Sequence, residues 1–378
     1  MNILILNWRD IKHPLSGGAE ISLLEHAKYW KQKGNTITWI SSSFKDAKKK
    51  EVIDGITVIR KGSHYTVHLL TALSYLRGEI GKPDIVVDCF HFLPYLSPLY
   101  IPRRKVIGLI NEVAGKVWFS NLFYPFAFIG YIIEPYIISF YKGIPFITGS
   151  DSAKNDLMNI GIGEDTIHVV HHGFTQLPVP EKIKKETHPT LIFLARVSVD
   201  KGIIDAIKAF VEVKKHVKNL QFWIVGKEEK IGFLQSLLNN SDFKDSKKSI
   251  NYYGFVSEKE KFILLKKAWI LIHPSKKEGW GLNVIEAASQ ATPTIGYDVE
   301  GLRDSVINGK TGLLVERQNY MALAQSISTL IVDKNKTMYN ALSKNAQGWS
   351  RNFKWDVSVK KSWNIISKMY EENQQPKS

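Results

Sequence analysis

Apolar runs of strand length alternate with helical patterns along the first half of the chain. Residues Glu20–Lys33 repeat apolar side chains at the spacing of one helix face, directly after a Gly17-Gly18 turn. The runs on either side are too short for helices and read as buried strands. Such alternation indicates βαβ units and a parallel sheet. The predicted strands are Ile3–Asn7, Thr36–Ser41, Asp84–Asp88 and Val106–Ile110.

The same alternation restarts after a proline-rich, charged stretch, Leu177–Pro189, which we interpret as a linker. A helix is predicted at Ile203–Val213. The last helix is amphipathic, with four large apolar residues at helical spacing: Val359, Trp363, Ile366 and Tyr370. The predicted strands of this half are Leu191–Ala195, Leu220–Val225, Ile250–Tyr253, Trp269–His273 and Pro293–Gly296.

The length of 378 residues exceeds one ordinary core, so we expect two domains. The pattern places them at residues 1–178 and 179–355. Residues 356–378 are expected to form a C-terminal helix that packs back on the first domain.

An aromatic segment at residues 118–141 stands apart from this pattern. Its length suits a membrane span, but Pro125, Gly130, Glu134 and Pro135 interrupt it, and a central carboxylate is costly in lipid. Three interpretations stay open. The segment is a pair of buried helices, a shallow insertion into a membrane surface favoured by aromatic residues and basic charge, or a true span.

The composition bears on which partners the protein binds and on the compartment in which it is found. A net charge of +15 favours anionic partners, such as phosphate-bearing substrates or an anionic membrane face. The one basic run, Lys48–Lys50, has no interleaved aromatic residues, so no nucleic-acid partner is expected. The single cysteine, Cys89, excludes an internal disulfide and fits a reducing compartment. The start, Met1–Asn7, lacks the features of a signal peptide, so we expect a cytoplasmic protein.

The most informative stretch runs from Glu278 to Glu286. An apolar strand leads into a glycine-bearing turn and then a helix, which places backbone N–H groups where they can bind an anion such as a diphosphate. The two carboxylates could accept hydrogen bonds from hydroxyls at two ends of one long ligand. Taken alone, the stretch also fits a capped core helix with two surface acids.

Two further loops follow predicted strands. Arg196 and Lys201 come after the first strand of the second half, where two cations could neutralise a diphosphate as a metal would, or could be solvated loop charges. The Gly17-Gly18 turn is no dinucleotide fingerprint. Gly309-Lys310-Thr311 is no P-loop, because Asp304 stands where its first glycine should be.

These motifs together resemble the GT-B glycosyltransferases of family 4, a group of retaining enzymes. The resemblance spans nearly the whole chain and implies an α/β fold of two Rossmann-like, doubly wound domains facing a central cleft. The first domain would bind the acceptor and the second the nucleotide-sugar donor. The matching pieces are Gly17–Glu20, Arg196–Gly202, Ile224–Gly226, Tyr253–Val256, Glu278–Glu286, Ala291–Pro293, Gly301 and Asn308–Val315.

The resemblance implies a role for each matching position. Arg196 and Lys201 would grip the donor diphosphate, Glu278 would bind the transferred sugar, and Glu286 would bind the ribose. The other expected donor contacts are backbone positions: Gly17, Gly18, Gly226, Val256, Trp280, Gly281 and Leu282.

The family often places an Asp or His near the reacting sugar, at the end of a strand of the first domain. Asp88 and His91 are both candidates here, and either could instead be a helix cap or a loop histidine. The pair His171-His172 is interpreted as a hinge and cleft-wall feature. No third ligand accompanies it, so no metal is expected.

The sequence thus predicts a retaining hexosyltransferase that requires no cofactor. It would use a UDP-glucose or GDP-mannose type of donor and a glycan or lipid-linked acceptor. The expected place is the cytoplasmic membrane face, with a possible anionic membrane contact through residues 118–141. The alternatives are a sugar-nucleotide epimerase or other GT-B relative, or a non-catalytic protein bound peripherally to a membrane.

Overall fold

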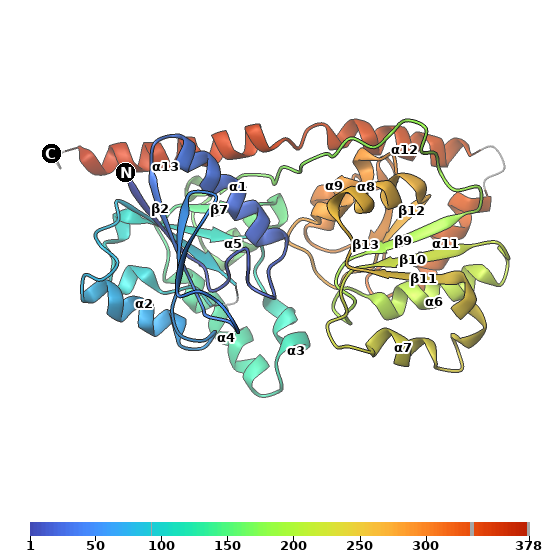
Figure 1. The fold of residues 1–378 in the computed structure, drawn as a ribbon, viewed down its shortest axis with the longest axis horizontal. Coiled ribbons are helices and arrows are strands. Elements are labelled where there is room, and N and C mark those ends of the chain that lie inside the picture. The colour runs from blue at the N-terminus through green and yellow to red at the C-terminus, as the bar shows by residue number, and fades with distance from the viewer. Residues whose placement is uncertain (92, 333–335, 376–378) are drawn as a thin grey trace. The chain divides into compact units, whose positions relative to one another are not determined.

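The chain folds into two compact units in the computed structural model, which describes residues 1–91, 93–332 and 336–375 (Figure 1). Unit 1 comprises residues 1–173 and 354–378, and unit 2 comprises residues 174–353. The first unit therefore contains both chain ends, and the second is a continuous stretch. Each unit is described by itself below.

Unit 1 is built on an eight-stranded sheet in the order β3-β4-β2-β1-β5-β6-β7-β8. All neighbouring strands are parallel except the β3–β4 hairpin at one edge. The central strands are mostly apolar because helices cover both faces of the sheet. The strands are β1 (Asn2–Leu6), β2 (Thr36–Ser41), β3 (Lys50–Ile53), β4 (Ile56–Arg60), β5 (Ile85–Phe90), β6 (Val106–Ile110), β7 (Phe146–Thr148) and β8 (Ile167–Val169).

Two different sets of helices cover the faces of this sheet (Figure 1). Successive residues of β1 point to opposite sides, so that Leu4 and Leu6 join one core and Ile3 and Ile5 the other. The first core contains side chains from α2 (Val67–Leu76), α4 (Phe126–Ser139) and α5 (Asp151–Ile160). The second contains side chains from α1 (Gly18–Gln32) and α13 (Trp355–Gln374).

Helix α13 belongs to unit 1 although it follows unit 2 in the chain. It packs along α1, where Ser362 Oγ lies 2.8 Å from His26 Nδ1 and accepts a hydrogen bond from Trp30 Nε1 at 3.1 Å. The limits of the two units, at residues 173 and 353, lie near the values of 178 and 355 expected from the sequence.

Unit 2 contains a six-stranded parallel sheet in the order β11-β10-β9-β12-β13-β14. Its strands are β9 (Thr190–Leu194), β10 (Gln221–Val225), β11 (Ile250–Gly254), β12 (Ile270–His273), β13 (Thr294–Tyr297) and β14 (Gly312–Val315). Its helices are α6 (Ile203–Lys214), α7 (Phe233–Leu238), α8 (Glu258–Lys267), α9 (Leu282–Ser289), α10 (Leu302–Ser305), α11 (Tyr320–Val332) and α12 (Thr337–Ser350). Two parallel Rossmann-like sheets confirm the predicted fold class.

The aromatic segment forms two short helices, α3 (Trp118–Asn121) and α4. The interpretation as a buried pair is wrong, because Phe123 is 80% exposed and most large side chains of the segment reach solvent. The interpretation as a span is not supported either, since no helix among the described residues is long and apolar enough to cross a membrane.

Candidate active site

Two loops of unit 2 meet where β9 and β12 end. The strands are neighbours and parallel, so their carboxyl ends share one edge of the sheet, the edge at which ligands bind in open α/β sheets. The loop after β9 contains Arg196 and Lys201, and the loop after β12 contains Glu278. The sequence therefore placed these three residues on the same edge, and the structure brings Lys201 and Glu278 into direct contact.

Glu278 is the centre of an ion group. Its Oε1 accepts hydrogen bonds from Lys201 Nζ at 2.6 Å and from His273 Nε2 at 3.1 Å. Burial alone would raise the pKa of Glu278, but the charge of Lys201 and the bond from His273 outweigh it and hold that pKa well below its usual range. These contacts all fall on Oε1, and none of them involves Oε2.

His273 was not predicted as a site residue, although it ends β12 only five positions before Glu278. The side-chain amide of Asn283 donates to His273 Nδ1 at 3.3 Å and also to the carbonyl oxygen of Leu194. This network assigns the proton of His273 to Nε2, which then donates to Glu278. The histidine is 2% exposed, so it orients the carboxylate from inside the unit.

Two glycines let these loops approach the backbone of their neighbours. A Cβ on Gly202 would lie 1.9 Å from the carbonyl oxygen of Pro274, and a Cβ on Gly226 would lie 1.8 Å from that of Ala195. Both residues have positive φ, +77° and +141°. Gly226, which was predicted as a donor contact, thus holds the loops after β9 and β10 together.

Arg196 extends from the same edge and is half exposed, with an ion pair to Asp200 at 3.2 Å. Helix α9 starts just after Gly281, whose φ is +85°. Its first N–H groups have no partner within the helix, which is the usual setting for an anion. Trp280 is buried against Phe353, with ring centroids 5.0 Å apart, and so anchors the turn before the helix.

Glu286 lies on α9 and is engaged by a cation that the sequence did not suggest. Lys261 Nζ on α8 donates to Glu286 Oε1 at 2.7 Å and pairs with Glu258 at 2.8 Å. Burial raises the pKa of Glu286, which the charge of Lys261 only partly offsets. Val256 follows β11 and is half-buried against the unit 2 core.

In unit 1 the Gly17-Gly18 turn is fixed by Glu20. The Glu20 carboxylate accepts from Gly17 N at 2.8 Å and from Arg9 Nε at 3.1 Å, and lies 3.2 Å from His91 Nε2. Burial would raise the pKa of Glu20, but His91 and Arg9 bring it to about 2. Glu20 is therefore ionised, and it organises the start of α1 at the carboxyl edge of the unit 1 sheet.

The two reaction candidates of unit 1 occupy different settings. Asp88 is fully buried, and its carboxylate accepts from Tyr95 N at 2.9 Å, Ser97 N at 3.0 Å, Ser97 Oγ at 2.6 Å and Tyr141 OH at 2.6 Å. It has no open side for a substrate, so we remove it from the reacting groups. The side chain of His91 is 16% exposed, with Nδ1 accepting from Arg9 at 3.1 Å.

An aromatic group at this edge of unit 1 was also missed. It gathers from the loops after β1, β2 and β4, which are distant in sequence and adjacent in the sheet. Trp8 contacts His13 at 5.2 Å and His64 at 4.1 Å between ring centroids, and Phe44 contacts His13 at 5.4 Å. Aromatic faces of this kind offer apolar surface with polar tips.

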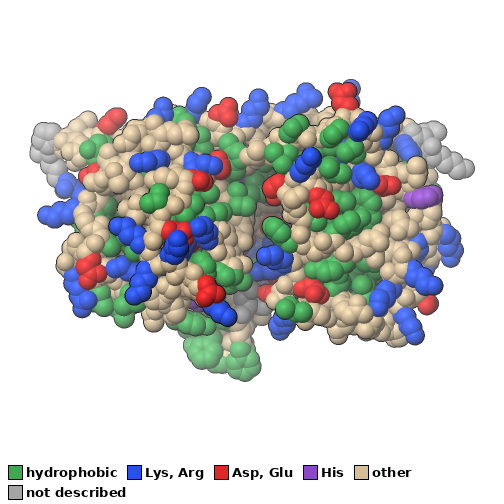
Figure 2. Space-filling model, viewed as in Figure 1, with side chains coloured by type: hydrophobic (Ala, Val, Ile, Leu, Met, Phe, Trp, Pro, Cys, Tyr) green, Lys and Arg blue, Asp and Glu red, His purple; other side chains and the backbone are tan. Residues whose placement is uncertain are grey.

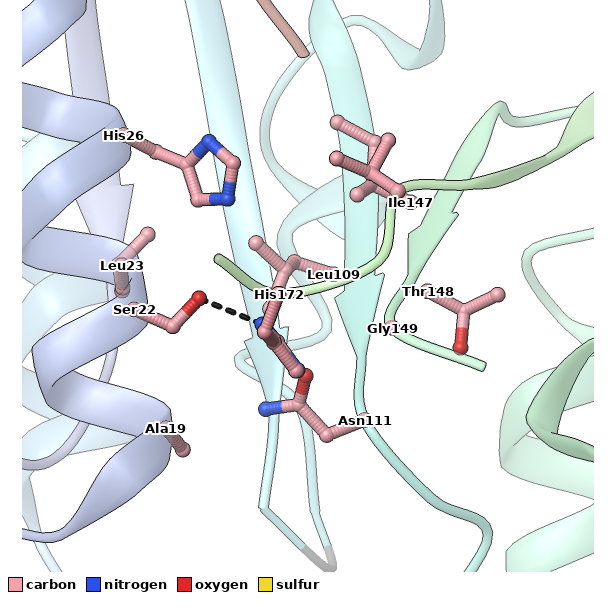
Figure 3. Close-up of a pocket in the computed structure, with 11 residues that line it drawn as sticks. Ala19, Ser22, Leu23, His26, Leu109, Asn111, Ile147, Thr148, Gly149 and His172 are labelled. Atoms are coloured by element: carbon pink, nitrogen blue, oxygen red, sulfur yellow. Dashed lines mark hydrogen bonds between the residues drawn. The ribbon is translucent and has the colours of Figure 1, made fainter. Parts of the chain in front are cut away.

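His172 lines a small cavity in unit 1 and donates to or accepts from Ser22 Oγ at 2.6 Å (Figure 3). Burial lowers the pKa of His172 to about 4 and that of His26 to about 3, so both rings are neutral near pH 7. The cavity of about 10 Å³ has room for one water at most. Among the residues that the structure describes, no three His, Cys, Asp or Glu side chains are grouped to hold a metal.

Comparison with known proteins agrees with this geometry. Residues 178–349, which all lie in unit 2, match the family described as Glycosyl transferases group 1. The capsular polysaccharide biosynthesis glycosyltransferase CapM of Staphylococcus aureus is 24% identical over 50% of this chain and 50% of its own length. An uncharacterized glycosyltransferase of Methanocaldococcus jannaschii is 25% identical over 97% of this chain and 96% of its own.

The aligned part of the chain spans about half the length of most of the curated relatives it matches. Solved structures extend the likeness to the whole fold. Sucrose-phosphate synthase from Thermosynechococcus elongatus superposes with a TM-score of 0.78 at 16% identity, covering 98% of this chain and 99% of its own. Anabaena HepE in complex with UDP-glucose gives 0.70 at 16% identity, covering 97% and 100%. These structural likenesses show the GT-B fold. The family match and the curated relatives support the predicted class of enzyme, a glycosyltransferase.

Proposed function

We propose that the chain transfers a hexose, with retention of configuration, from a UDP- or GDP-linked donor to a glycan or lipid-linked acceptor. The observation on which this rests is the Lys201–Glu278–His273 group at the strand ends of the group 1 domain. The complex of the similar HepE fold with UDP-glucose supports a nucleotide sugar as the donor. Membership of glycosyltransferase family 4, expected from the sequence motifs, is part of the proposal.

In the proposed reaction the bond between the anomeric carbon and the distal phosphate oxygen breaks, and negative charge grows on that phosphate. Arg196, Lys201 and the start of α9 at residues 280–282 stabilise the charge, since they lie at one edge of one sheet. Two fixed cations serve here in the role that a metal has in other transferases, so no cofactor is needed.

The two glutamates bind the two ends of the donor. Glu278 Oε2 accepts a hydroxyl of the transferred sugar, and Glu286 accepts the ribose hydroxyls. The pKa of Glu278 is depressed, so this carboxylate stays an ionised acceptor across the physiological range. Backbone near Val256 and Gly226 meets the base.

The acceptor is assigned to the carboxyl edge of the unit 1 sheet. Gly17 and Gly18 allow close approach there, and the rings of Trp8 and His64 suit the apolar face of a sugar. Of the two candidates Asp88 and His91, we assign the position near the reacting sugar to His91, because its side chain is partly exposed. The acceptor oxygen forms the new bond to the anomeric carbon, and its proton passes to the departing phosphate.

The test is a donor screen that follows nucleoside diphosphate release with and without lipid-linked acceptors. We expect release with a UDP- or GDP-hexose, and a loss on the order of 100-fold for Arg196→Ala. The matched control is Arg303→Ala, which removes an exposed arginine paired with Asp298 in the same unit. Wild-type rates in Arg196→Ala, or an epimer or free sugar without acceptor product, would overturn the proposal.

The proposal includes a location at the cytoplasmic face of a membrane, which the net charge of +15 and a lipid-linked acceptor would favour. In the simplest version of this proposal, residues 118–141 contact the membrane. The exposed apolar side chains of unit 1 support this part of the proposal.

A further inference from the structure

Exposed apolar side chains of unit 1 gather on two elements. One is the α3–α4 tip, which we define as residues 119–140. The other is α2, where Leu69 is 65% and Leu76 is 68% exposed. Figure 2 shows hydrophobic side chains collected at the tip. The exposed members are Tyr65, Leu69, Leu70, Leu73 and Leu76 near α2, and Phe119, Leu122, Phe123, Tyr124, Phe126, Phe128, Ile129, Tyr131, Ile132, Ile133, Tyr136 and Phe140 at the tip.

Both elements lie on the same face of the unit 1 sheet. Val67 of α2 and Ile138 of α4 belong to one core cluster, so the outer sides of these helices turn away from the same sheet face (Figure 1). On the opposite face, α1 and α13 each present one large exposed apolar side chain among the described residues, Ile21 and Val357. Unit 1 therefore has one apolar face, and an apolar patch of this extent marks an interaction site.

The tip shows no exposed carboxylate. Its one acid, Glu134, is 3% exposed and accepts hydrogen bonds from Ala114 N at 2.7 Å, Gly115 N at 2.7 Å and Trp118 Nε1 at 3.0 Å. The carboxylate fastens α4 to the turn before α3 instead of facing outward. The carboxylate of Glu134, which in the sequence counted against lipid contact, is therefore not on the surface of the tip.

A basic cavity opens beside the leucines of α2. Its volume is about 360 Å³, and Leu70 and Leu73 form its apolar side. Its cationic side consists of Lys49, Arg60, Lys61 and Arg77, and Glu79 is its one acid.

The cations of the cavity are not all equally compensated. Arg60 forms ion pairs with two carboxylates, Asp10 at 2.7 Å and Glu51 at 2.5 Å. In contrast, the single carboxylate of Glu79 pairs with two cations, Lys61 at 3.1 Å and Arg77 at 3.9 Å. The cavity keeps an excess of positive charge next to exposed leucines. This pairing fits an amphiphile with an anionic head and an apolar tail.

We propose that this face of unit 1 docks on an anionic lipid bilayer through both elements at once. The α3–α4 tip and the α2 leucines insert into the interface, and the α2 cavity takes a lipid phosphate. Tyr124 and Tyr136, 62% and 73% exposed, supply the amphipathic rings that favour the headgroup level. The inference extends the membrane-near acceptor of the proposed function to a second element. It depends on unit 1 alone, so failure of docking leaves donor turnover untouched.

Flotation of the full chain with vesicles tests the proposal. We expect binding to vesicles containing phosphatidylglycerol and at least about tenfold weaker binding to pure phosphatidylcholine, with the difference lost at high salt. Phe123→Ser with Phe126→Ser should weaken binding at least about tenfold, since each removes a large apolar side chain from the interface. The matched control is Ile21→Ser with Val357→Ser on the opposite face, which should bind as wild type.

Separate variants address α2. Leu69→Ser with Leu76→Ser should weaken binding to both vesicle types, whereas Lys49→Gln with Arg77→Gln should remove the preference for phosphatidylglycerol. Unchanged binding in both α2 variants would overturn the role of α2. Equal or no binding of the wild type to the two vesicle types would overturn the proposal as a whole.

Sedimentation of the same variants separates docking on lipid from self-association. A wild-type dimer that Phe123→Ser with Phe126→Ser converts to monomer, without vesicle binding by the wild type, would make this face a contact between copies and contradict the proposal. Nucleoside diphosphate release by each variant, measured in solution with a soluble acceptor, should stay at the wild-type rate.

Discussion

Two carboxylates near the carboxyl ends of strands, the buried Asp88 in unit 1 and the half-buried Glu278 in unit 2, differ in their partners. Asp88 is surrounded by neutral donors only, and its burial raises its pKa. Glu278 is surrounded by Lys201 and His273, and its pKa is lowered despite burial. Neutral donors that saturate the carboxylate of Asp88 fasten a loop, whereas Lys201 and His273 on one oxygen keep Glu278 ionised.

The strongest way to break this comparison is Glu278→Gln. The substitution keeps the shape but removes the charge that holds Lys201 and His273, so we expect donor turnover to fall on the order of 100- to 1,000-fold. The folded state should remain intact, as a thermal melt would show. Turnover within about threefold of wild type would place Glu278 with Asp88 as a structural residue.

The reciprocal change is Asp88→Asn. Its new amide N–H groups would face the donors of Tyr95, Ser97 and Tyr141, which we expect to cost about 3 kcal/mol of the free energy of unfolding. Chemical denaturation measures this loss, and turnover per folded molecule should not change. The control is Asp84→Asn just before β5, where the half-buried carboxylate accepts one bond from Asn2 N. An equal loss of unfolding free energy in both variants would contradict the structural role assigned to Asp88.

The pH dependence of stability separates the two kinds of carboxylate further. Glu20 has a pKa lowered from 4.5 to about 2, so its contribution is present above pH 4.5 and is lost as pH falls toward 2. Asp88, with a raised pKa, has the opposite sign, because its ionised form is disfavoured in the folded chain. Glu20→Gln should flatten the acid loss of stability between pH 5 and 2 by about 2 kcal/mol.

The control for this titration is Glu25→Gln on the same helix α1, where the carboxylate pairs with Lys28 at the surface. Its acid profile should follow that of the wild type. A Glu20→Gln profile that also follows the wild type would mean that Glu20 is not held ionised by Arg9 and His91.

The smallest expected effect concerns the ribose site. Glu286→Gln should raise the KM for the donor about tenfold with little change in kcat, because a binding contact far from the reacting bond is lost. Glu258→Gln is the matched control, since Glu258 also pairs with Lys261 but is mostly exposed. A fall in kcat without a change in KM would contradict the ribose role.

Much of the fold could be predicted because most of its strands are largely apolar and its loops contain glycines. β2 and β6 have the predicted bounds, and β9 and β12 lie within one residue of theirs. Helix α2 was not predicted because its buried face contains Thr71 and Ser74 while its leucines are exposed, so no apolar face marks the buried side. The β3–β4 hairpin was also missed, although its Asp54-Gly55 turn, with both φ values positive, is a recognisable signal.

The candidate site was predicted only in part, for a physical reason. Positions on the loops after β9 and β12 follow from strand order, so Lys201 and Glu278 could be placed on one edge. Partners from other elements, such as Lys261 of α8 beside Glu286, depend on packing that no local pattern encodes. The sequence does not show which side chains are buried either. For this reason it could not decide whether Asp88 or His91 faces the reacting sugar.

The central claim is that Lys201, held against Glu278, binds the donor phosphate. The most direct measurement is nucleoside diphosphate release by Lys201→Ala beside Lys215→Ala, which breaks an exposed pair with Glu212 on α6. The account predicts a loss on the order of 100-fold or more for Lys201→Ala and none for Lys215→Ala, with equal thermal melts. Equal rates in the two variants would contradict it.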